Sequence, residues 1–255
     1  MLSAMSNVDA RRHVVVLAPM PLELEAIVQA FGLRQTGEEP DAPWSGLVGH
    51  SQVTAIHTGM GPPVTREAAK ALFEGGDPLG SRPDHLMSIG ICGGLRRDLE
   101  VGTLLNPEVI VEHSTGAVYD HRPPGSAPRL GKLATMEAVT LDRGLSSRLL
   151  EGGFLGVDME SSAVAEMGEA YGCRWSVYRC IGDRHFDGLL DDRVVATANP
   201  DGSPNVEAVT RLLAEDPGLL PKLKQLAHDS AMAARRAAEA AVRGCLALDD
   251  EGLDR

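Results

Sequence analysis

The sequence predicts a single α/β domain, in which helices cover both faces of a central, mostly parallel and partly mixed sheet to give three α/β/α layers. Three observations predict this fold class. Short β-branched runs alternate with segments whose apolar residues have helical spacing. Glycine-rich turns follow several of these runs. The length of 255 residues suits one large domain. We expect residues 1–12 to form a flexible N-terminal arm and residues 13–248 to form the domain.

The first half of the chain begins the alternation. The run His-Val-Val-Val-Leu-Ala at 13–18 is typical of a buried strand. Two prolines end that run, and the apolar spacing of 22–31 predicts a helix with acidic residues in its first turn. Short strands at 44–48 and 52–57 flank Gly49, which predicts a hairpin. A glycine-proline turn then leads to a helix expected at 64–73.

The second half continues the pattern with longer loops. A buried strand is expected at 84–91, closed by the turn Cys92-Gly-Gly94. Further expected strands lie at 104–112, 133–135, 155–157 and 175–181, and a helix is expected at 161–171. The stretch from 114 to 128 is rich in Gly, Pro and His and predicts a long loop. Residues 188–203 are expected to be irregular, and 205–246 helical with breaks at Pro217 and Pro221.

Composition excludes several functional classes. The formal net charge of −12 argues against a partner bound through its phosphate backbone, so no nucleic-acid partner is expected. No run of about 18 apolar residues is present, so we expect no membrane-spanning segment. The four cysteines show no C-x-x-C pairing, which argues against zinc ribbons and disulfide scaffolds. These features together predict a cytoplasmic protein.

Three carboxylates are candidate functional groups because each follows an expected strand. In open α/β sheets, ligands bind beyond the carboxyl ends of the strands, where Glu23, Glu160 and Asp183 are placed. A carboxylate there acts as an acid, a base or an acceptor for sugar hydroxyls. A structural role is the alternative, because acidic residues also favour helix N-termini and cap turns.

Two other patterns carry less information. The glycine-rich segment at 89–94 matches neither the dinucleotide nor the nucleoside-triphosphate fingerprint, and a tight turn with positive φ is its structural alternative. His113, His121 and His185 lie in expected loops with Asp120 and Asp187, but their spacing matches no metal-ligand motif. We therefore expect no metal site.

Five segments, taken in order, carry a family resemblance. They are Met20-Pro-Leu-Glu23, Thr58-Gly-Met-Gly61, Ser88-Ile-Gly-Ile-Cys-Gly-Gly-Leu95, Gly156-Val-Asp-Met-Glu-Ser-Ser-Ala-Val-Ala165 and Tyr178-Arg-Cys-Ile-Gly-Asp183. The fourth looks like V-E-M-E-x-x-A-x-A and the fifth like V-R-x-I-S-D. The chain thereby resembles the nucleoside phosphorylase/nucleosidase superfamily across about residues 14–184.

The resemblance implies a role for each matching residue. Glu160 would hold the ribose hydroxyls, and Met159 would pack on the sugar. Asp183 would donate a proton to the purine, while Glu23, assisted by Arg179, would activate water. The expected wall and floor of the base pocket are Ile91, Cys92, Gly93, Val157 and Asp158. The resemblance further implies a homodimer, and the reaction needs neither a metal nor an organic cofactor.

The choice of nucleophile follows from residues that are absent. Phosphorylases of this superfamily carry a G-D-P-x-R loop after the first strand and an arginine entering the glycine turn. This chain has Ala18-Pro-Met-Pro-Leu-Glu23 and Ser88 at those places. A phosphate dianion would lack its guanidinium donors there. The sequence therefore predicts hydrolysis, as in 5′-methylthioadenosine/S-adenosylhomocysteine nucleosidases.

Departures from the motifs keep two alternatives open. Gly182 replaces the serine before the aspartate, Asp158 replaces a glutamate, and the purine-stacking aromatic motif is not recognisable. The sequences of the 156–165 segment and of the C-terminal part are more similar to the hopanoid-associated branch of the superfamily. The identity of the substrate's 5′ substituent therefore stays open. One alternative is phosphorolysis, with phosphate held by Arg66 or by another residue that the sequence does not identify. The other is a catalytically weak nucleoside-binding or sensor domain.

Overall fold

A computed structural model describes residues 12–39, 41–75, 82–125 and 128–250. The strands are β1 (Arg12–Ala18), β2 (Arg34–Gln35), β3 (Trp44–Val48), β4 (Ser51–His57), β5 (His85–Gly94), β6 (Leu104–Leu105), β7 (Val109–Glu112), β8 (Val118–Asp120), β9 (Lys132–Thr135), β10 (Phe154–Asp158) and β11 (Arg174–Arg184). The helices are α1 (Pro21–Phe31), α2 (Pro62–Glu74), α3 (Arg143–Glu151), α4 (Ser161–Ala170), α5 (Asp192–Val195), α6 (Val206–Glu215), the 3₁₀ helix η1 (Pro217–Leu219) and α7 (Leu220–Asp250). The predicted arm at 1–12 lies outside the described residues, except for Arg12, which begins β1.

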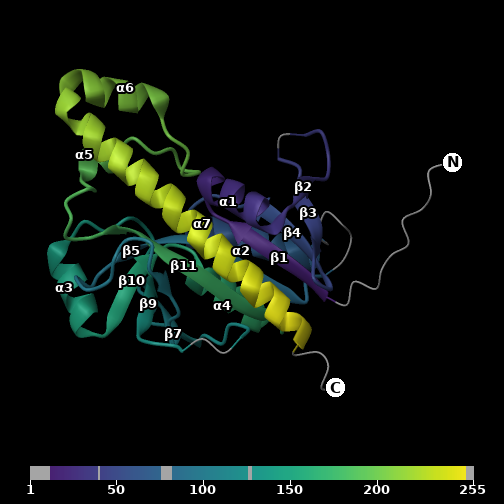
Figure 1. Cartoon of the computed structure of the whole chain (residues 1–255). Coiled ribbons are helices and arrows are strands. Elements are labelled where there is room, and N and C mark those ends of the chain that lie inside the picture. The colour runs from purple at the N-terminus through teal and green to yellow at the C-terminus, as the bar shows by residue number, and fades with distance from the viewer. Residues whose placement is uncertain (1–11, 40, 76–81, 126–127, 251–255) are drawn as a thin grey trace.

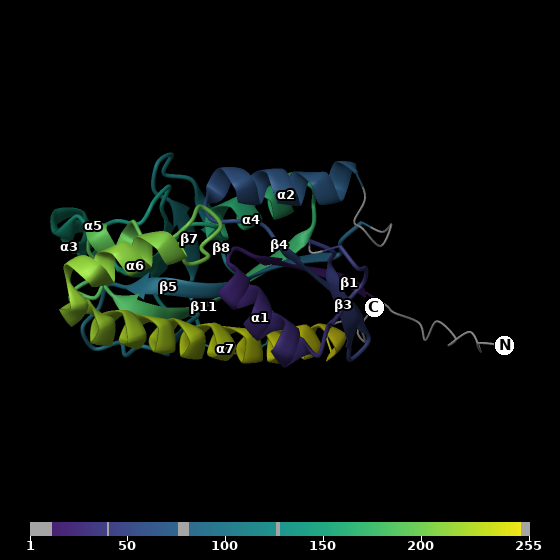
Figure 2. The same cartoon turned by 90° about the horizontal axis from the view of Figure 1, so that it is seen from above.

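The strands form one mixed sheet in the order β2-β3-β4-β1-β5-β10-β9-β7-β8, with β11 added beside β5 and paired also with β6. The long ladders β1–β4 and β5–β11 are parallel, whereas β10 meets β5 in antiparallel orientation. Helices α1 and α7 cover one face, and α2 and α4 cover the other (Figures 1 and 2). The predicted three-layer α/β/α fold with a partly mixed sheet is thus confirmed.

The core consists of two apolar layers on the two sheet faces. Valines of β1 pack alternately, with Val14 and Val16 against α1 and α7, and Val15 against α2 and α4. Alternation along a strand sends successive side chains to opposite faces, which explains why the whole run is apolar. Six alanines of α7 between positions 233 and 241 are buried, and their small side chains let this 31-residue helix lie close to the sheet. None of the helices in the described residues is both long and apolar enough to cross a membrane.

The glycine segment after 91 differs from the prediction. Cys92, Gly93 and Gly94 continue β5 rather than closing it with a turn, and neither of these glycines has positive φ. A Cβ at Gly94 would lie 3.0 Å from Ile181 on β11, and one at Gly93 would lie 3.2 Å from Val157 on β10. These glycines therefore allow close approach of neighbouring strands, which sequence alone does not distinguish from a turn.

Four smaller expectations were also wrong in part. The stretch 104–112 is divided into β6 and β7, and the expected loop at 114–128 contains β8, which pairs with β7 as a hairpin. The expected irregular stretch at 188–203 contains the short helix α5. Pro217 begins η1 as a break, but Pro221 lies in the first turn of α7, where its missing N–H leaves no hydrogen bond unmade.

Candidate active site

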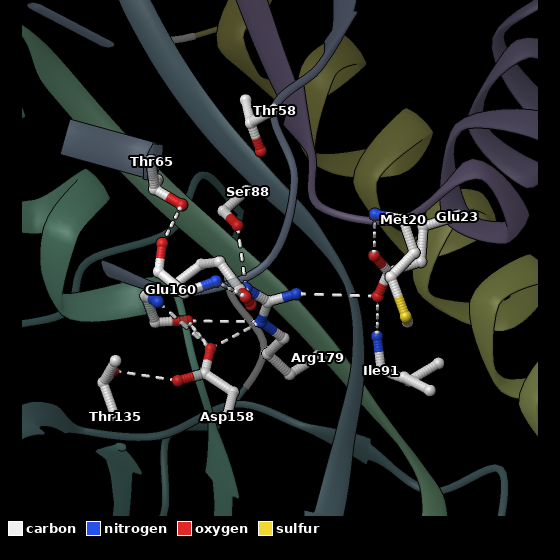
Figure 3. Close-up of polar contacts among 12 residues, drawn as sticks. Met20, Glu23, Thr58, Thr65, Ser88, Ile91, Thr135, Asp158, Glu160 and Arg179 are labelled. Atoms are coloured by element: carbon white, nitrogen blue, oxygen red, sulfur yellow. Dashed lines mark hydrogen bonds and ion pairs between the residues drawn. The ribbon is translucent and has the colours of Figure 1, made fainter. Parts of the chain in front are cut away.

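Arg179 lies at the centre of the charged cluster shown in Figure 3. Its side chain is fully buried in the middle of β11, where residues 176–182 are all buried and none of the others is charged. Nε donates to Asp158 Oδ2 at 2.7 Å, and Nη2 donates to Ser88 Oγ at 2.9 Å and to Glu160 Oε2 at 3.2 Å. Nη1 faces Glu23 Oε1 at 3.9 Å and has no hydrogen-bond partner among the described residues. One cation thus connects three carboxylates from three different elements.

Glu23 is positioned by the start of α1. Pro21 occupies the first turn of the helix, and Glu23 reaches back so that Met20 N–H donates to its Oε2 at 3.0 Å. The other oxygen, Oε1, accepts from Ile91 N–H of β5 at 2.7 Å. A Cβ at Gly90 would lie 2.0 Å from Glu23 Oε1 and 2.5 Å from Arg179 Nη1. Only glycine at position 90 therefore allows the carboxylate and the guanidinium to face each other.

Glu160 precedes α4 and connects it to the start of α2. Its Oε1 accepts from Gly61 N–H at 2.9 Å, and its Oε2 accepts from Arg179. The backbone at Gly61 has φ +101°, which favours glycine, and Pro62 begins α2 immediately after it. The Thr58–Gly61 turn and the strand that precedes α4 are thereby held together by one carboxylate.

Asp158 lies beneath the guanidinium, and its carboxylate is bound by protein donors. Thr135 Oγ1 donates to Oδ1 at 2.8 Å, while Ser161 N–H at 3.1 Å and the Ser161 hydroxyl donate to Oδ2, which Arg179 also contacts. Because the side chain is fully buried and all of these donors are internal, Asp158 orients Arg179. Sequence reasoning placed Asp158 in the base pocket and gave no role to Thr135 or Ser161. A buried arginine on an apolar strand is the signal that calls for such a counterion.

Asp183 follows a bulge in β11 and lies beside the distal part of β5. The ladder shifts register between Ile181 and Asp183, so that Asp183 pairs with Gly93. A Cβ at Gly93 would meet Val157 at 3.2 Å and Asp183 Oδ1 at 3.6 Å, so these three residues lie together. Gly182 is the extra residue of the bulge, and a Cβ there would approach Ile91 at 3.2 Å. A serine at position 182 would therefore crowd Ile91.

Cys92 lies between the Asp183 group and the Arg179 cluster. Its buried thiol is subject to the charges of Asp158, Arg179 and Asp183, and burial raises its pKa well above the usual value. The remaining predicted wall residues are half-buried: Ile91, Gly93, Val157 and Met159. The structure therefore brings the predicted site residues to one region around residues 90–93 of β5, where buried charged side chains lie next to half-buried ones. Their roles toward a ligand stay predictions.

Burial shifts the protonation of the three candidate carboxylates. It raises the pKa of Glu23 to about 7, although Arg179 and two backbone N–H groups act in the opposite direction. Burial also raises the pKa of Asp183 to about 7, with a smaller contribution from the Asp187 charge. Burial likewise raises the pKa of Glu160, opposed by Arg179. Near neutral pH the site thus holds carboxylates that can each give or take a proton.

His121 and Arg66 make their contacts outside this cluster. His121 is buried, contacts the Pro107 carbonyl at 2.9 Å and accepts from Val177 N–H at 3.2 Å, so its ring has a structural role. No three His, Cys, Asp or Glu side chains in the described parts of the chain are arranged to hold a metal. Arg66 on α2 is ion-paired with Glu112, and with Glu166 at 2.6 Å.

Removing the central cation should destabilise the fold. Arg179→Met leaves Asp158, Glu23 and Glu160 buried without their counterion, and breaking a buried pair from one side costs about 3–5 kcal/mol. We expect the free energy of unfolding at pH 7 to fall by that amount in urea titrations. At pH 5 the loss should shrink, because carboxyl groups with raised pKa values are then protonated and neutral.

Arg193 provides the matched control for this prediction. It also pairs with two carboxylates, Asp191 and Asp216, both at 3.3 Å, but its side chain is 55% exposed. Arg193→Met should cost at most about 1 kcal/mol, because solvent screens exposed pairs. Equal losses for the two variants would show that Arg179 is not the electrostatic centre of the cluster.

Comparison with known proteins places the chain in a family. A family model described as the phosphorylase superfamily matches residues 13–155, which is more than half of the chain. The chain belongs to this superfamily. The resemblance seen in the sequence motifs is thereby confirmed at the level of the family.

A curated relative and several solved structures are similar to this superfamily member. The 5′-methylthioadenosine/S-adenosylhomocysteine nucleosidase of Chromohalobacter salexigens is 21% identical over 203 residues, covering 68% of this chain and 84% of the relative. The structure of the same-named enzyme from S. pneumoniae with a transition-state inhibitor has a TM-score of 0.67 at 16% identity, covering 93% and 100% of the two chains. Futalosine hydrolase of Helicobacter pylori has a TM-score of 0.63 at 14% identity, covering 94% and 98%. At these identities the structural likeness establishes a shared fold.

Proposed function

We propose that this superfamily member is a hydrolytic N-glycosidase that releases the purine base from an adenine nucleoside with a substituent at the 5′ position. The observation that carries the proposal is the ion pair between Glu23 and Nη1 of Arg179, which face each other over Gly90 at 3.9 Å, while Nη1 has no hydrogen-bond partner among the described residues. Asp183 follows Arg179 further along β11 and lies beside Gly93. The names of the relatives, which are nucleosidases and a futalosine hydrolase, support the reaction class.

The chemistry follows from the charge that develops during cleavage. Breaking the N-glycosidic bond gives oxocarbenium character to the sugar and negative charge to the departing base. A protonated Asp183 would donate to purine N7, and an ionised Glu23 would take a proton from the attacking water. Glu160 would accept hydrogen bonds from the ribose hydroxyls, with Met159 against the sugar. Metal and organic cofactors have no part in this scheme.

Phosphorolysis with Arg66 as the phosphate ligand is the alternative within enzymes. Arg66 is bound to Glu112 and Glu166, so its positive charge is already compensated. Within the described residues, the ion pairs of Glu23, Asp158 and Glu160 are all with Arg179. Three carboxylates around one guanidinium disfavour a dianion. This charge balance favours water over phosphate as the nucleophile.

The deciding experiment measures release of the purine base, with and without phosphate: adenine from 5′-methylthioadenosine, S-adenosylhomocysteine and a 5′-alkyl adenosine, and hypoxanthine from inosine. We expect release from the 5′-substituted adenine nucleosides at rates that do not depend on phosphate. Tight nucleoside binding without turnover would instead select the sensor alternative. The homodimer and the cytoplasmic location stay predictions.

The pH profile of kcat/KM should be bell-shaped with its maximum near pH 7. The reactive form needs Glu23 ionised and Asp183 protonated, and burial raises the pKa of each to about 7. At pH values below the maximum, activity should fall because Glu23 gains a proton. At pH values above the maximum, it should fall because Asp183 loses one. Steady-state rates from pH 5 to 9 test this. A flat profile across that range would contradict the assigned acid and base.

A further inference from the structure

The connection between α5 and α6 forms a tight turn at Asn199–Ser203. Asn199 N–H donates to the Ser203 carbonyl at 2.8 Å, and Gly202 N–H donates to the Asn199 carbonyl at 2.9 Å. Asp201 Oδ1 accepts from Ser203 N–H at 3.0 Å and from Ser203 Oγ at 2.6 Å. These internal bonds make the turn a compact unit.

This turn reaches from the helices at one end of the molecule back to the start of α1 (Figures 1 and 2). Gly202, with φ +78°, lies directly against Met20, the residue before α1. A Cβ at position 202 would lie 2.3 Å from Met20 Cγ, 2.8 Å from Sδ and 3.1 Å from Cβ.

Met20 is also the residue whose N–H binds Glu23. That N–H donates to Glu23 Oε2, and Ile91 N–H holds the other oxygen. We infer that Gly202 is a positioning residue, which sets the place of Met20 and through it the orientation of the Glu23 carboxylate toward Arg179. In this way a turn about 180 residues distant in sequence determines the geometry of the candidate base.

A methyl group added at position 202 is expected to displace the backbone of Met20 as well as its side chain. A methionine side chain is flexible, so Cγ and Sδ can swing away from an added methyl group. Met20 Cβ moves only with the backbone, and the backbone carries the N–H that binds Glu23. An alanine at position 202 is therefore expected to weaken the bond from Met20 N–H to Glu23. The expected effect on catalysis rests on the proposed function. The expected displacement of Met20 and Glu23 does not.

The test follows the carboxyl group of Glu23 directly. ¹³C NMR titration of the full chain with labelled glutamate reports each carboxyl group, and the resonance lost in Glu23→Gln identifies this one. Gly202→Ala should raise its titration midpoint by about one pH unit, because the Met20 N–H bond favours the ionised form. The charged groups facing Glu23, namely Arg179, Asp158 and Glu160, are unchanged in this variant. Base release at pH 7 should fall roughly tenfold in kcat/KM.

Two comparisons separate the contact from backbone strain. Gly153 has φ +83° with no atom within 4 Å of an added Cβ, so Gly153→Ala carries the same strain without the clash and should leave the midpoint unchanged. In a Met20→Gly background, Gly202→Ala should have no further effect, because the contacted Cβ, Cγ and Sδ atoms are all gone. In Met20→Phe the larger side chain would clash with Gly202 from the side of α1. This variant should raise the titration midpoint of Glu23 and provides the test if Gly202→Ala does not fold.

The outcomes are distinct. A midpoint that is unchanged in the folded Gly202→Ala or Met20→Phe variants overturns the inference, as does an equal shift in Gly153→Ala. If Gly202→Ala shows the predicted shift but the native protein releases no base, the proposed function is overturned and the positioning role of Gly202 remains.

Discussion

Asp183→Asn should lower kcat by about 10²–10⁴ while nucleoside affinity stays within about tenfold of the native value. Asparagine keeps the size of the side chain and can donate a hydrogen bond to the base, but it has no proton to transfer. Asparagine occupies the same place beside Gly93 and Val157, so we expect these neighbours to keep their positions. Single-turnover rates together with equilibrium binding of an adenine nucleoside separate the two effects.

Asp187→Asn is the matched control for Asp183. Asp187 is also half-buried, is ion-paired with Arg184 at 2.7 Å, and its charge helps to raise the pKa of Asp183. Its removal should leave the maximal rate nearly unchanged and move the alkaline limb of the profile to lower pH, since the pKa of Asp183 then falls. If Asp183→Asn weakens binding as much as it slows turnover, Asp183 is a recognition residue and the proton donor lies elsewhere.

The sequence predicted the fold class because patterns of apolar residues are local. The run at 13–18 and the spacing at 22–31 are enough to identify β1 and α1, and nearly every other long element was found in the same way. The carboxyl-end rule then placed Glu23, Glu160 and Asp183 near the same ends of the strands. The family motifs added Arg179 and the residues around Cys92.

What the sequence left out are contacts between distant segments. That Cys92–Gly94 form a strand rather than a turn depends on Val157 and Ile181, which approach from other strands. The role of Asp158 as the counterion of Arg179 requires the pairing of two non-consecutive strands with β5. Neither is encoded in a local pattern, because strand order and register decide which side chains meet.

Glu23→Gln should lower kcat by about 10²–10⁴. In the native protein, base release should not depend on phosphate. Glutamine still accepts a hydrogen bond from Ile91 N–H or from Met20 N–H, so the start of α1 is largely retained, but a neutral amide cannot take a proton from water. Glu25→Gln is the control, because Glu25 lies on the same helix with an exposed side chain. It should leave kcat unchanged.

The phosphate arm of that experiment separates a hydrolase from a phosphorylase by charge. The motif resemblance predicts that Ser88 takes the place of the arginine that phosphorylases carry before the glycine segment, and in the structure its hydroxyl accepts from Arg179. Glu23 would repel a phosphate by about 4 kcal/mol for unit charges 4 Å apart at an effective dielectric of 20, whereas water meets no such repulsion. We expect free ribose derivatives as the sugar product, with and without millimolar phosphate. A ribose 1-phosphate derivative as the main product would overturn hydrolysis, and it would require Arg66 or another cation to leave its carboxylate partners and enter the site.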